Sequence, residues 1–349
     1  MNRLIISSML ACCTFAPQVT RAEADSKAGA TDVAFVSIRS GDAHIYTSRG
    51  GVDRVLTQGK SINTQPAWSV DGRLAFTSSR NGLPRIYVMN EDGSGQRRLT
   101  QDDRLESAAS WSPDGKTLAF FSMSIDTGSV DVRIVDVASG KSVTVPGNGK
   151  DKGPLPPNWS ADGKRFAFTA SDDKNKTQIW VVDHDASNLR NVSGKFDARS
   201  KAWASMSPDG KRVAYVADMR GTMPVVVSDV ETGESKVLTA DGPASYESPR
   251  WSPDGKQLVV ASNRDDPLGA RNDIFIVNAD GSGVRNLTQN PSEDFDPHWA
   301  ADGKSIVFDS LRTGTSQLYR VNVGSRETVR ISSNPSHDME PAMRPLAKR

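Results

Sequence analysis

The stretch SPRWSPDGKQLVVASNR, at Ser248–Arg264, decides the fold of this chain because it is repeated. Close copies read PAWSVDGRLAFTSSR from Pro66 and ASWSPDGKTLAFFS from Ala109, and diverged copies read PNWSADGKRFAFTA, ASMSPDGKRVAYVA and PHWAADGKSIVFDS. The aspartate of the shared turn returns every 43 to 48 residues, at Asp71, Asp114, Asp162, Asp209, Asp254 and Asp302. A period of this length is typical of a propeller blade or of one unit of a solenoid.

One unit contains the signals for four short strands. In Ser112–Gly115 the proline sets the first central φ of a turn, the aspartate tolerates the second position, and the glycine accepts the left-handed conformation. Residues that favour strands flank this turn and a second turn at Ala138–Lys141. The expected strands are Ala109–Trp111, Thr117–Ser122, Val132–Val137 and Ser142–Val145.

A four-stranded unit of this size cannot bury both of its faces alone, so neighbouring units must stack face to face. Radial stacking with closure leaves only short, protected strand edges, which is the propeller solution. Large aromatic side chains occupy one repeat position, where one diverged repeat carries Met206 instead, and we expect them between the blades. They are Trp68, Trp111, Trp159, Trp251 and Trp299.

The two ends of the repeat region predict how the ring closes. Val33–Thr57 has the pattern of the second, third and fourth strands of a unit without its first strand. Asp338–Pro345 resembles the missing first strand. We therefore predict an all-β fold, a seven-bladed β-propeller over residues 32–345 with a tail at 346–349, closed by pairing of the last strand with the first blade. Six blades are the alternative.

The N-terminal residues 1–24 have the pattern of a signal peptide, followed by a short linker at 25–31. Met1–Arg3 is basic, Leu4–Ala16 is mostly apolar and too short to span a bilayer, and Ala22–Ala24 offers a small-x-small cleavage site. We expect export to the periplasm and no transmembrane segment in the mature chain. The alternative is a lipoprotein signal, with Cys12 as the lipidated residue.

Charge excludes one class of partner. The chain has 43 lysine and arginine residues against 42 acidic residues, a net charge of +1. Such a balance gives no global positive field, so no nucleic-acid partner is expected.

The repeat pattern Pro-x-Trp-Ser-Pro-Asp-Gly-Lys, followed by an Ala-Phe strand, Ser-x-Arg, Asp-Gly and Leu-Thr, resembles the WD-like propeller repeats of the TolB family of periplasmic proteins. The resemblance extends over nearly the whole mature chain. It implies a binding protein whose partner is an envelope protein such as the Pal lipoprotein, or a cell-wall glycan. TolB itself also has an α/β domain that contacts TolA, which we expect to be absent because few residues precede Val33.

Acidic residues at the starts of the first strands suggest a site at one channel mouth. In the last units Asp294, Asp296, Asp338 and Glu340 recur around the Pro-x-Trp motif, with His298 and His337 nearby. Such oxygens suit Ca²⁺ or a cationic partner, and added imidazole suits Mn²⁺. The alternative is structural: cross-strand ion pairs, such as Arg312 with Asp294. The predicted contact surface is Glu106, Tyr246, Glu247, Asp294, Asp296, His298, His337, Asp338 and Glu340.

Motifs that indicate catalysis are missing from the sequence. It has no Gly-x-Ser-x-Gly elbow, no His-Glu-x-x-His and no phosphate loop. We therefore predict a non-catalytic binding protein without a cofactor, unless Ca²⁺ or Mn²⁺ binds at the channel mouth. The alternative is a metal-dependent polysaccharide lyase. Oligogalacturonide lyases are similar in being seven-bladed propellers with a histidine-rich metal site, for which this chain offers His298 and His337.

Overall fold

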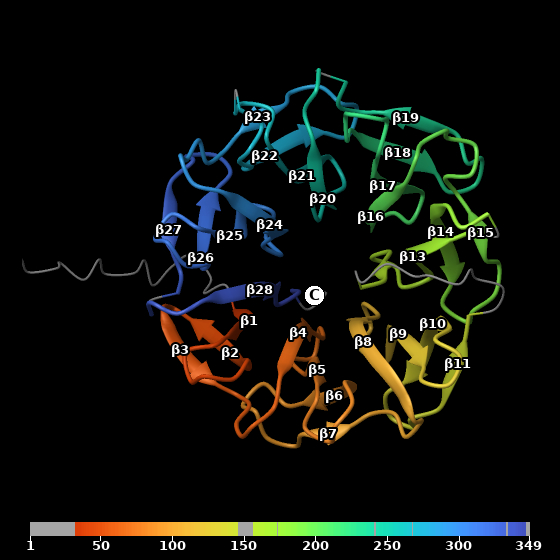
Figure 1. Cartoon of the computed structure of the whole chain (residues 1–349), viewed down its shortest axis with the longest axis vertical. Helices are drawn as coiled ribbons and strands as arrows, with labels where there is room; N and C mark the ends of the chain where they lie inside the picture. The colour runs from red at the N-terminus through yellow and green to blue at the C-terminus, as the bar shows by residue number, and fades with distance from the viewer. Residues whose placement is uncertain are drawn as a thin grey trace, which may run out of the picture. The chain divides into compact units, whose positions relative to one another are not determined.

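The computed structural model describes residues 32–145, 156–172, 174–240, 242–266, 268–332 and 334–346. They form seven four-stranded antiparallel sheets, the blades of a propeller (Figure 1). Among those residues no helix has the length and apolar character needed to cross a bilayer. The all-β, seven-bladed prediction is confirmed, and the six-bladed alternative is excluded.

Each blade runs from an innermost strand at the channel to an outermost strand at the rim. Blade 1 is β28 (Asp338–Met343), β1 (Val33–Ser37), β2 (His44–Arg49) and β3 (Val52–Val55); blade 2 is β4 (Asn63–Trp68), β5 (Leu74–Ser78), β6 (Arg85–Met89) and β7 (Arg97–Arg98); blade 3 is β8 (Arg104–Trp111), β9 (Thr117–Ser124), β10 (Val130–Asp136) and β11 (Ser142–Thr144). Blade 4 is β12 (Asn158–Trp159), β13 (Arg165–Ser171), β14 (Thr177–Asp183) and β15 (Arg190–Asn191); blade 5 is β16 (Lys201–Met206), β17 (Arg212–Ala217), β18 (Val225–Asp229) and β19 (Ser235–Val237). Blade 6 is β20 (Tyr246–Trp251), β21 (Gln257–Ser262), β22 (Asp273–Asn278) and β23 (Arg285–Asn286); blade 7 is β24 (Asp294–Trp299), β25 (Ser305–Ser310), β26 (Gln317–Asn322) and β27 (Thr328–Arg330).

Blade 1 is built from both ends of the chain, as the sequence predicts. Strand β28 pairs antiparallel with β1, with Met343 opposite Val33 and Asp338 opposite Ser37. Figure 1 shows blue β28 beside red β1, which closes the ring of blades. The C-terminal strand is therefore part of the hydrogen-bonded framework.

The first strands share an irregularity that shapes the channel. In six of them the residue before the Pro-x-Trp proline position has a positive φ, and the pairing register shifts around it. This is a β-bulge, which bends the strand and redirects its side chains. The bulge residues, all in the left-handed region that favours glycine, are Gln65, Ala108, Trp203, Ser248, Asp296 and Glu340.

The repeated tryptophans join neighbouring blades, which confirms their predicted place. Trp111 packs with Ile86 and Val88 of β6, and its indole N–H donates to the Ala67 carbonyl of blade 2 over 3.0 Å. The same bond to the preceding blade is made by Trp159, Trp251 and Trp299. The interface is thus apolar and also specific in register.

The other recurring residues have structural roles. The turn aspartate accepts hydrogen bonds from a nearby hydroxyl and a main-chain N–H, as Asp114 does from Ser112 Oγ at 2.6 Å and from Lys116 N at 3.0 Å. The Ser-x-Arg arginines lie over aromatic rings, as Arg80 does at 4.6 Å from the centre of the Tyr87 ring. These contacts recur from unit to unit and stabilise the blades locally.

Candidate functional site

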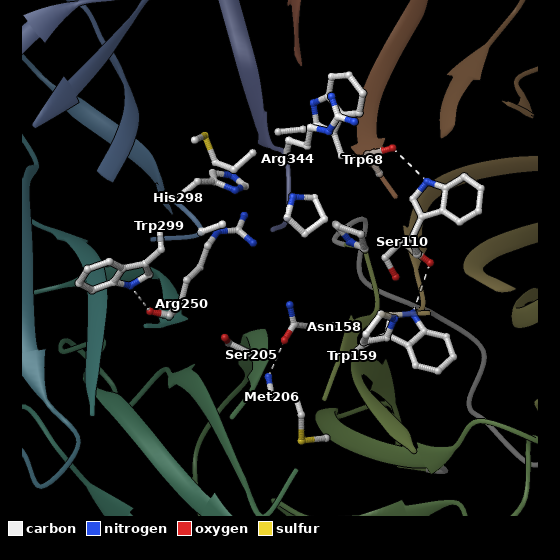
Figure 2. Close-up of a pocket in the computed structure, with 18 of the residues that line it drawn as sticks. Trp68, Ser110, Asn158, Trp159, Ser205, Met206, Arg250, His298, Trp299 and Arg344 are labelled. Carbon is white, nitrogen blue, oxygen red and sulfur yellow. Dashed lines mark hydrogen bonds between the residues drawn. The ribbon is translucent and has the colours of Figure 1, made fainter. Parts of the chain in front are cut away.

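The central channel contains a pocket of about 740 Å³. All seven first strands contribute to it: β4, β8, β12, β16, β20, β24 and β28. It extends from the bulge residues to the turns that follow the tryptophans. Figure 2 shows Arg250 and His298 directed towards its centre, with Trp159 and Trp299 at its periphery.

The end of the pocket near those turns is lined by one apolar residue from each blade. Each follows the serine of the Trp-Ser-Pro motif or its equivalent, and we call this set the turn ring. It is Val70, Pro113, Ala161, Pro208, Pro253, Ala301 and Pro345. The five repeated tryptophans also contribute to the lining. None of the turn-ring side chains has a hydrogen-bond donor or acceptor, so this end offers mainly apolar contact.

Polar side chains gather on the wall formed by blades 6, 7 and 1. Arg250 Nη2 lies 3.2 Å from Asp296 Oδ1, and His298 Nε2 lies 3.4 Å from the same oxygen. Burial favours neutral Asp296, but His298 and Arg250 outweigh it and lower the pKa of the carboxyl. Burial and the Arg250 charge lower the pKa of His298. At neutral pH the wall therefore carries an arginine–aspartate pair beside an uncharged imidazole.

Hydrogen bonds from main-chain N–H groups to side chains link four blades at the bulges, from blade 7 to blade 3. Glu340 Oε2 accepts the Gln65 N–H over 2.6 Å, and Gln65 Oε1 accepts the Ala108 N–H over 2.9 Å. Asp309, on β25, bonds in the same way to the main chain of Glu340. Each bulge releases an N–H from the strand ladder, and in these blades a side chain of the preceding blade satisfies it.

The structure divides the predicted contact residues into two groups. Asp296, His298 and Glu340 line the pocket. The other six lie towards the opposite end of the first strands. Asp294 and Asp338 are buried there and pair with Arg312 and Arg39 at 3.0 Å, which is the cross-strand pairing expected as the structural alternative. Burial nevertheless outweighs Arg312 and raises the pKa of Asp294.

The remaining predicted residues have individual surroundings. Glu106 is buried, bonds to Thr100 Oγ1 and to the Ile86 N–H, and has a pKa raised by burial. Tyr246 is buried in the apolar cluster between blades 5 and 6. Glu247 is half-buried, and burial together with Glu293 raises its pKa. Half-buried His337 accepts the Ser316 N–H over 3.2 Å. The binding role of all nine residues stays a prediction.

The predicted metal site requires several ligand side chains close together. Across the part of the chain that the structure describes, no three histidine, cysteine, aspartate or glutamate side chains are grouped as a metal site requires. The pocket histidine, His298, contacts Asp296, whereas His337 bonds elsewhere. Ca²⁺ or Mn²⁺ at the channel mouth stays a prediction.

Sequence reasoning missed Arg250, Asp309 and the turn ring. Arg250 occupies the x of Pro-x-Trp, a position that varies between repeats. Asp309 lies in a buried strand, SIVFDS, whose central residues are otherwise apolar. A charged residue in such a strand indicates a specific role, so the sequence pattern could have identified Asp309. The turn ring is visible in the repeats, but its residues match ordinary turn residues.

The fold and the channel define a closed β-propeller with a central pocket of ligand size. Residues 15–206 and 204–349 match the family model described as the TolB beta propeller domain. The chain belongs to this family, as its repeats suggested.

Some of the curated proteins that this chain resembles are much longer than it is. An uncharacterized peptidase of Bacillus subtilis, YuxL, is 27% identical over 237 residues, covering 67% of this chain and 27% of the relative. Dipeptidyl-peptidase 5 of Porphyromonas gingivalis is 26% identical over 292 residues, covering 79% of this chain and 41% of the relative. This chain thus spans less than half the length of either peptidase.

Solved structures share the fold. TolB from Acinetobacter baumannii superposes with a TM-score of 0.56 at 19% identity, covering 87% of this chain and 79% of that one. The oligogalacturonate lyase from Vibrio parahaemolyticus gives 0.65 at 18% identity, covering 84% and 86%. At these identities the likeness concerns the fold alone.

Proposed function

We propose that this chain is an exported, non-catalytic β-propeller that binds a protein or another cell-envelope component at its central channel. The observation that supports this is the pocket of about 740 Å³ to which every blade contributes. Its volume lies within the range of ligand sites, and a largely apolar lining with a few convergent polar groups is the usual pattern of such sites.

The partner we propose first is an envelope protein of the Pal lipoprotein kind, because the chain belongs to the TolB β-propeller family. A cell-wall glycan is the second candidate. The signal-peptide pattern of residues 1–24 supports a periplasmic location. The non-catalytic part of the proposal rests on the sequence, which has no Gly-x-Ser-x-Gly elbow and no His-Glu-x-x-His motif.

The test is affinity capture from a solubilised envelope extract, with and without chelator. Ala161→Trp fills the channel from the turn ring, where the residue is exposed. Ala138→Trp is the matched control, because Ala138 is exposed in an outer turn that does not line the pocket. We expect capture by the wild type and by Ala138→Trp in both buffers, and loss of capture by Ala161→Trp. Equal capture by all three proteins would place the partner elsewhere.

A lyase is the second candidate function, and the similar lengths and folds of this chain and the Vibrio enzyme favour it. It predicts that purified protein with Mn²⁺ converts oligogalacturonate to an unsaturated product with ultraviolet absorbance. It also predicts that a chelator abolishes this activity. An absence of product under both conditions removes the lyase.

A further inference from the structure

The polar wall of the pocket has an excess of negative charge. The Arg250–Asp296 pair is internally balanced, and His298 is uncharged because burial and Arg250 lower its pKa. Asp309, behind the wall, is 2% exposed, and burial with the neighbouring Asp296 charge raises its pKa well above the usual range. Asp309 does not line the pocket, so the balance of the wall depends on Glu340.

Glu340 is the acid that remains uncompensated. It lines the pocket, and one of its oxygens accepts the Gln65 N–H. Within the described ranges no basic side chain forms an ion pair with it. Arg344, at the rim, is held by Asp32 at 3.1 Å and Glu91 at 2.6 Å. Burial and the Asp296 charge raise the pKa of Glu340, because both disfavour its carboxylate form. A cation beside Glu340 would favour the carboxylate and so lower this pKa.

A second observation concerns Asp309, the acid buried behind the wall. Among the described residues, the buried Oδ1 atom of Asp309 has no hydrogen-bond partner, although the carboxyl bonds to the main chain of Glu340. Buried polar atoms normally find partners, in the protein or in a ligand or water. Asp309 does not line the pocket, so this oxygen lies behind the wall, next to the main chain of Glu340.

Apolar side chains line the end of the pocket near the turns. The turn ring contains no side-chain donor or acceptor, and the indole N–H groups of Trp111, Trp159 and Trp299 are already bonded to neighbouring carbonyls. A ligand that fits therefore has an apolar body and a cationic end. A carboxylate ligand would meet Glu340, whereas the Arg250 Nη2 group is already paired with Asp296 and only its buried Nε has no partner among the described residues.

We propose that the channel binds an apolar segment that ends in a primary amine or guanidinium group, as in a partner's lysine or arginine side chain flanked by apolar residues. The cation lies beside Glu340, and the apolar part packs against the turn ring. This inference rests on the proposed binding function and adds the charge and polarity of the ligand.

The experiment uses three capped tripeptides, Ac-Pro-Phe-Lys-NH₂, Ac-Pro-Phe-norleucine-NH₂ and Ac-Pro-Phe-Glu-NH₂. Binding is followed by tryptophan fluorescence, since the five repeated tryptophans line the pocket, and by titration calorimetry. Glu340→Gln removes the charge but retains an oxygen for the Gln65 N–H. Glu293→Gln is the matched control, because Glu293 is half-buried and does not line the pocket. Melting curves of both variants show whether the fold is intact.

We expect the lysine peptide to bind the wild type and Glu293→Gln equally, and Glu340→Gln about tenfold more weakly, as for the loss of one partly buried charge pair. The norleucine peptide should bind all three proteins alike, and the glutamate peptide should bind weakest. Ala161→Trp should weaken the lysine and norleucine peptides together.

The inference is overturned if the lysine peptide binds no better than the norleucine peptide, if Glu340→Gln leaves its affinity unchanged, or if no peptide binds. These outcomes differ from failure of the proposed function. Capture of an envelope partner that is lost in Ala161→Trp but kept in Glu340→Gln would retain the binding function and remove its cationic specificity.

Discussion

Blade 1 and blade 7 carry the same arginine–aspartate pair, but the chain connects the two partners differently. Arg312 and Asp294 are 18 residues apart and join two strands of one hairpin. Arg39 and Asp338 are 299 residues apart and join the two ends of the chain. The acids are fully buried in both blades, and both pairs measure 3.0 Å. One local interaction thus serves a hairpin in blade 7 and the closure of the ring in blade 1.

The contacts around the closing strand differ as well. Between blades 2 and 3, Trp111 donates to Ala67 and lies under Arg73, whose guanidinium carbon is 4.8 Å from the ring centre. Between blades 1 and 2, the buried Nε1 of Trp68 has no partner among the described residues, and Arg344 lies 5.2 Å from its ring. At this interface the ion pairs of Arg344 replace the indole hydrogen bond. The closure therefore depends more on charge than the interface between blades 2 and 3 does.

Removal of the closing strand should have the largest effect. A chain that ends at Asn334 lacks β28, so β1 loses its inner partner and the first blade loses a strand. We expect the melting temperature, measured by circular dichroism, to fall by more than about 10 °C. A point variant of an exposed outer strand, Val143→Thr, serves as the control. An unchanged melting curve would contradict the role of β28 in closure.

Variants of the two buried aspartates, Asp294 and Asp338, can distinguish the stability due to the ion pairs from the stability due to closure of the ring. Asp294→Asn leaves Arg312 without its acid and should cost about 3–5 kcal/mol of unfolding free energy. Asp338→Asn should cost less, because Arg39 keeps a second acid, Asp53, at 2.9 Å. Chemical denaturation of both variants measures the difference. If Asp338→Asn proves more destabilising, the closure itself, rather than the pairing of charges, limits stability.

Lys201 occupies the same repeat position in blade 5, where its ammonium group donates to neutral oxygens. It is 2% exposed, and Nζ donates to Gln178 Oε1 at 2.7 Å and to the Ser193 carbonyl at 3.0 Å. Burial lowers its pKa from 10.5 to about 8. Between these two values the unfolded chain retains the proton that the folded chain has lost. The free energy of unfolding should therefore rise with pH in this window, by roughly 3 kcal/mol in total.

The comparison with Lys201→Gln isolates this effect, because the other titrating groups are common to both proteins. Denaturation at pH 7, 8.5 and 9.5 should show the wild type gaining stability relative to the variant as the pH rises. A difference that stays constant over this range would mean that Lys201 is not desolvated in the folded state.

The smallest expected effect distinguishes the two tryptophan environments. Trp111→Phe removes an indole hydrogen bond and leaves the Ala67 carbonyl without its donor, whereas Trp68→Phe removes a nitrogen that has no partner among the described residues. We expect Trp111→Phe to cost about 1 kcal/mol more than Trp68→Phe in urea denaturation. Equal costs would indicate that packing alone holds both interfaces.

Much of the fold could be predicted because its signals are local. The Ser112–Gly115 turn sets one hairpin by its own residues, and the same turn recurs at a nearly fixed spacing. The closing strand could be predicted because Asp338–Met343 resembles its equivalents in the other repeats. Comparison of the repeats also showed which residues recur in many blades, such as Arg80 and Asp114, and therefore have structural roles. Residues found in one blade only are the candidates for a specific function.

The candidate site could be predicted in part. Asp296, His298 and Glu340 were recognised as acidic or imidazole residues of the first strands, and they do line the pocket. Asp294 and Asp338 were chosen by the same pattern, yet they are buried against arginines. The two sets are separated by two residues in sequence, but the bulge between them directs their side chains to different surroundings.

By itself the sequence determined the repeat, the number of blades, the closing strand and the burial of the tryptophans, because turn chemistry and side-chain periodicity act over a few residues. The tertiary structure alone decided which acids are paired, which end of the channel holds the pocket, and which carboxylate stays without a cation. Those outcomes depend on side chains from blades 6, 7 and 1, whose distances are set by strand register and by ring closure rather than by position along the chain.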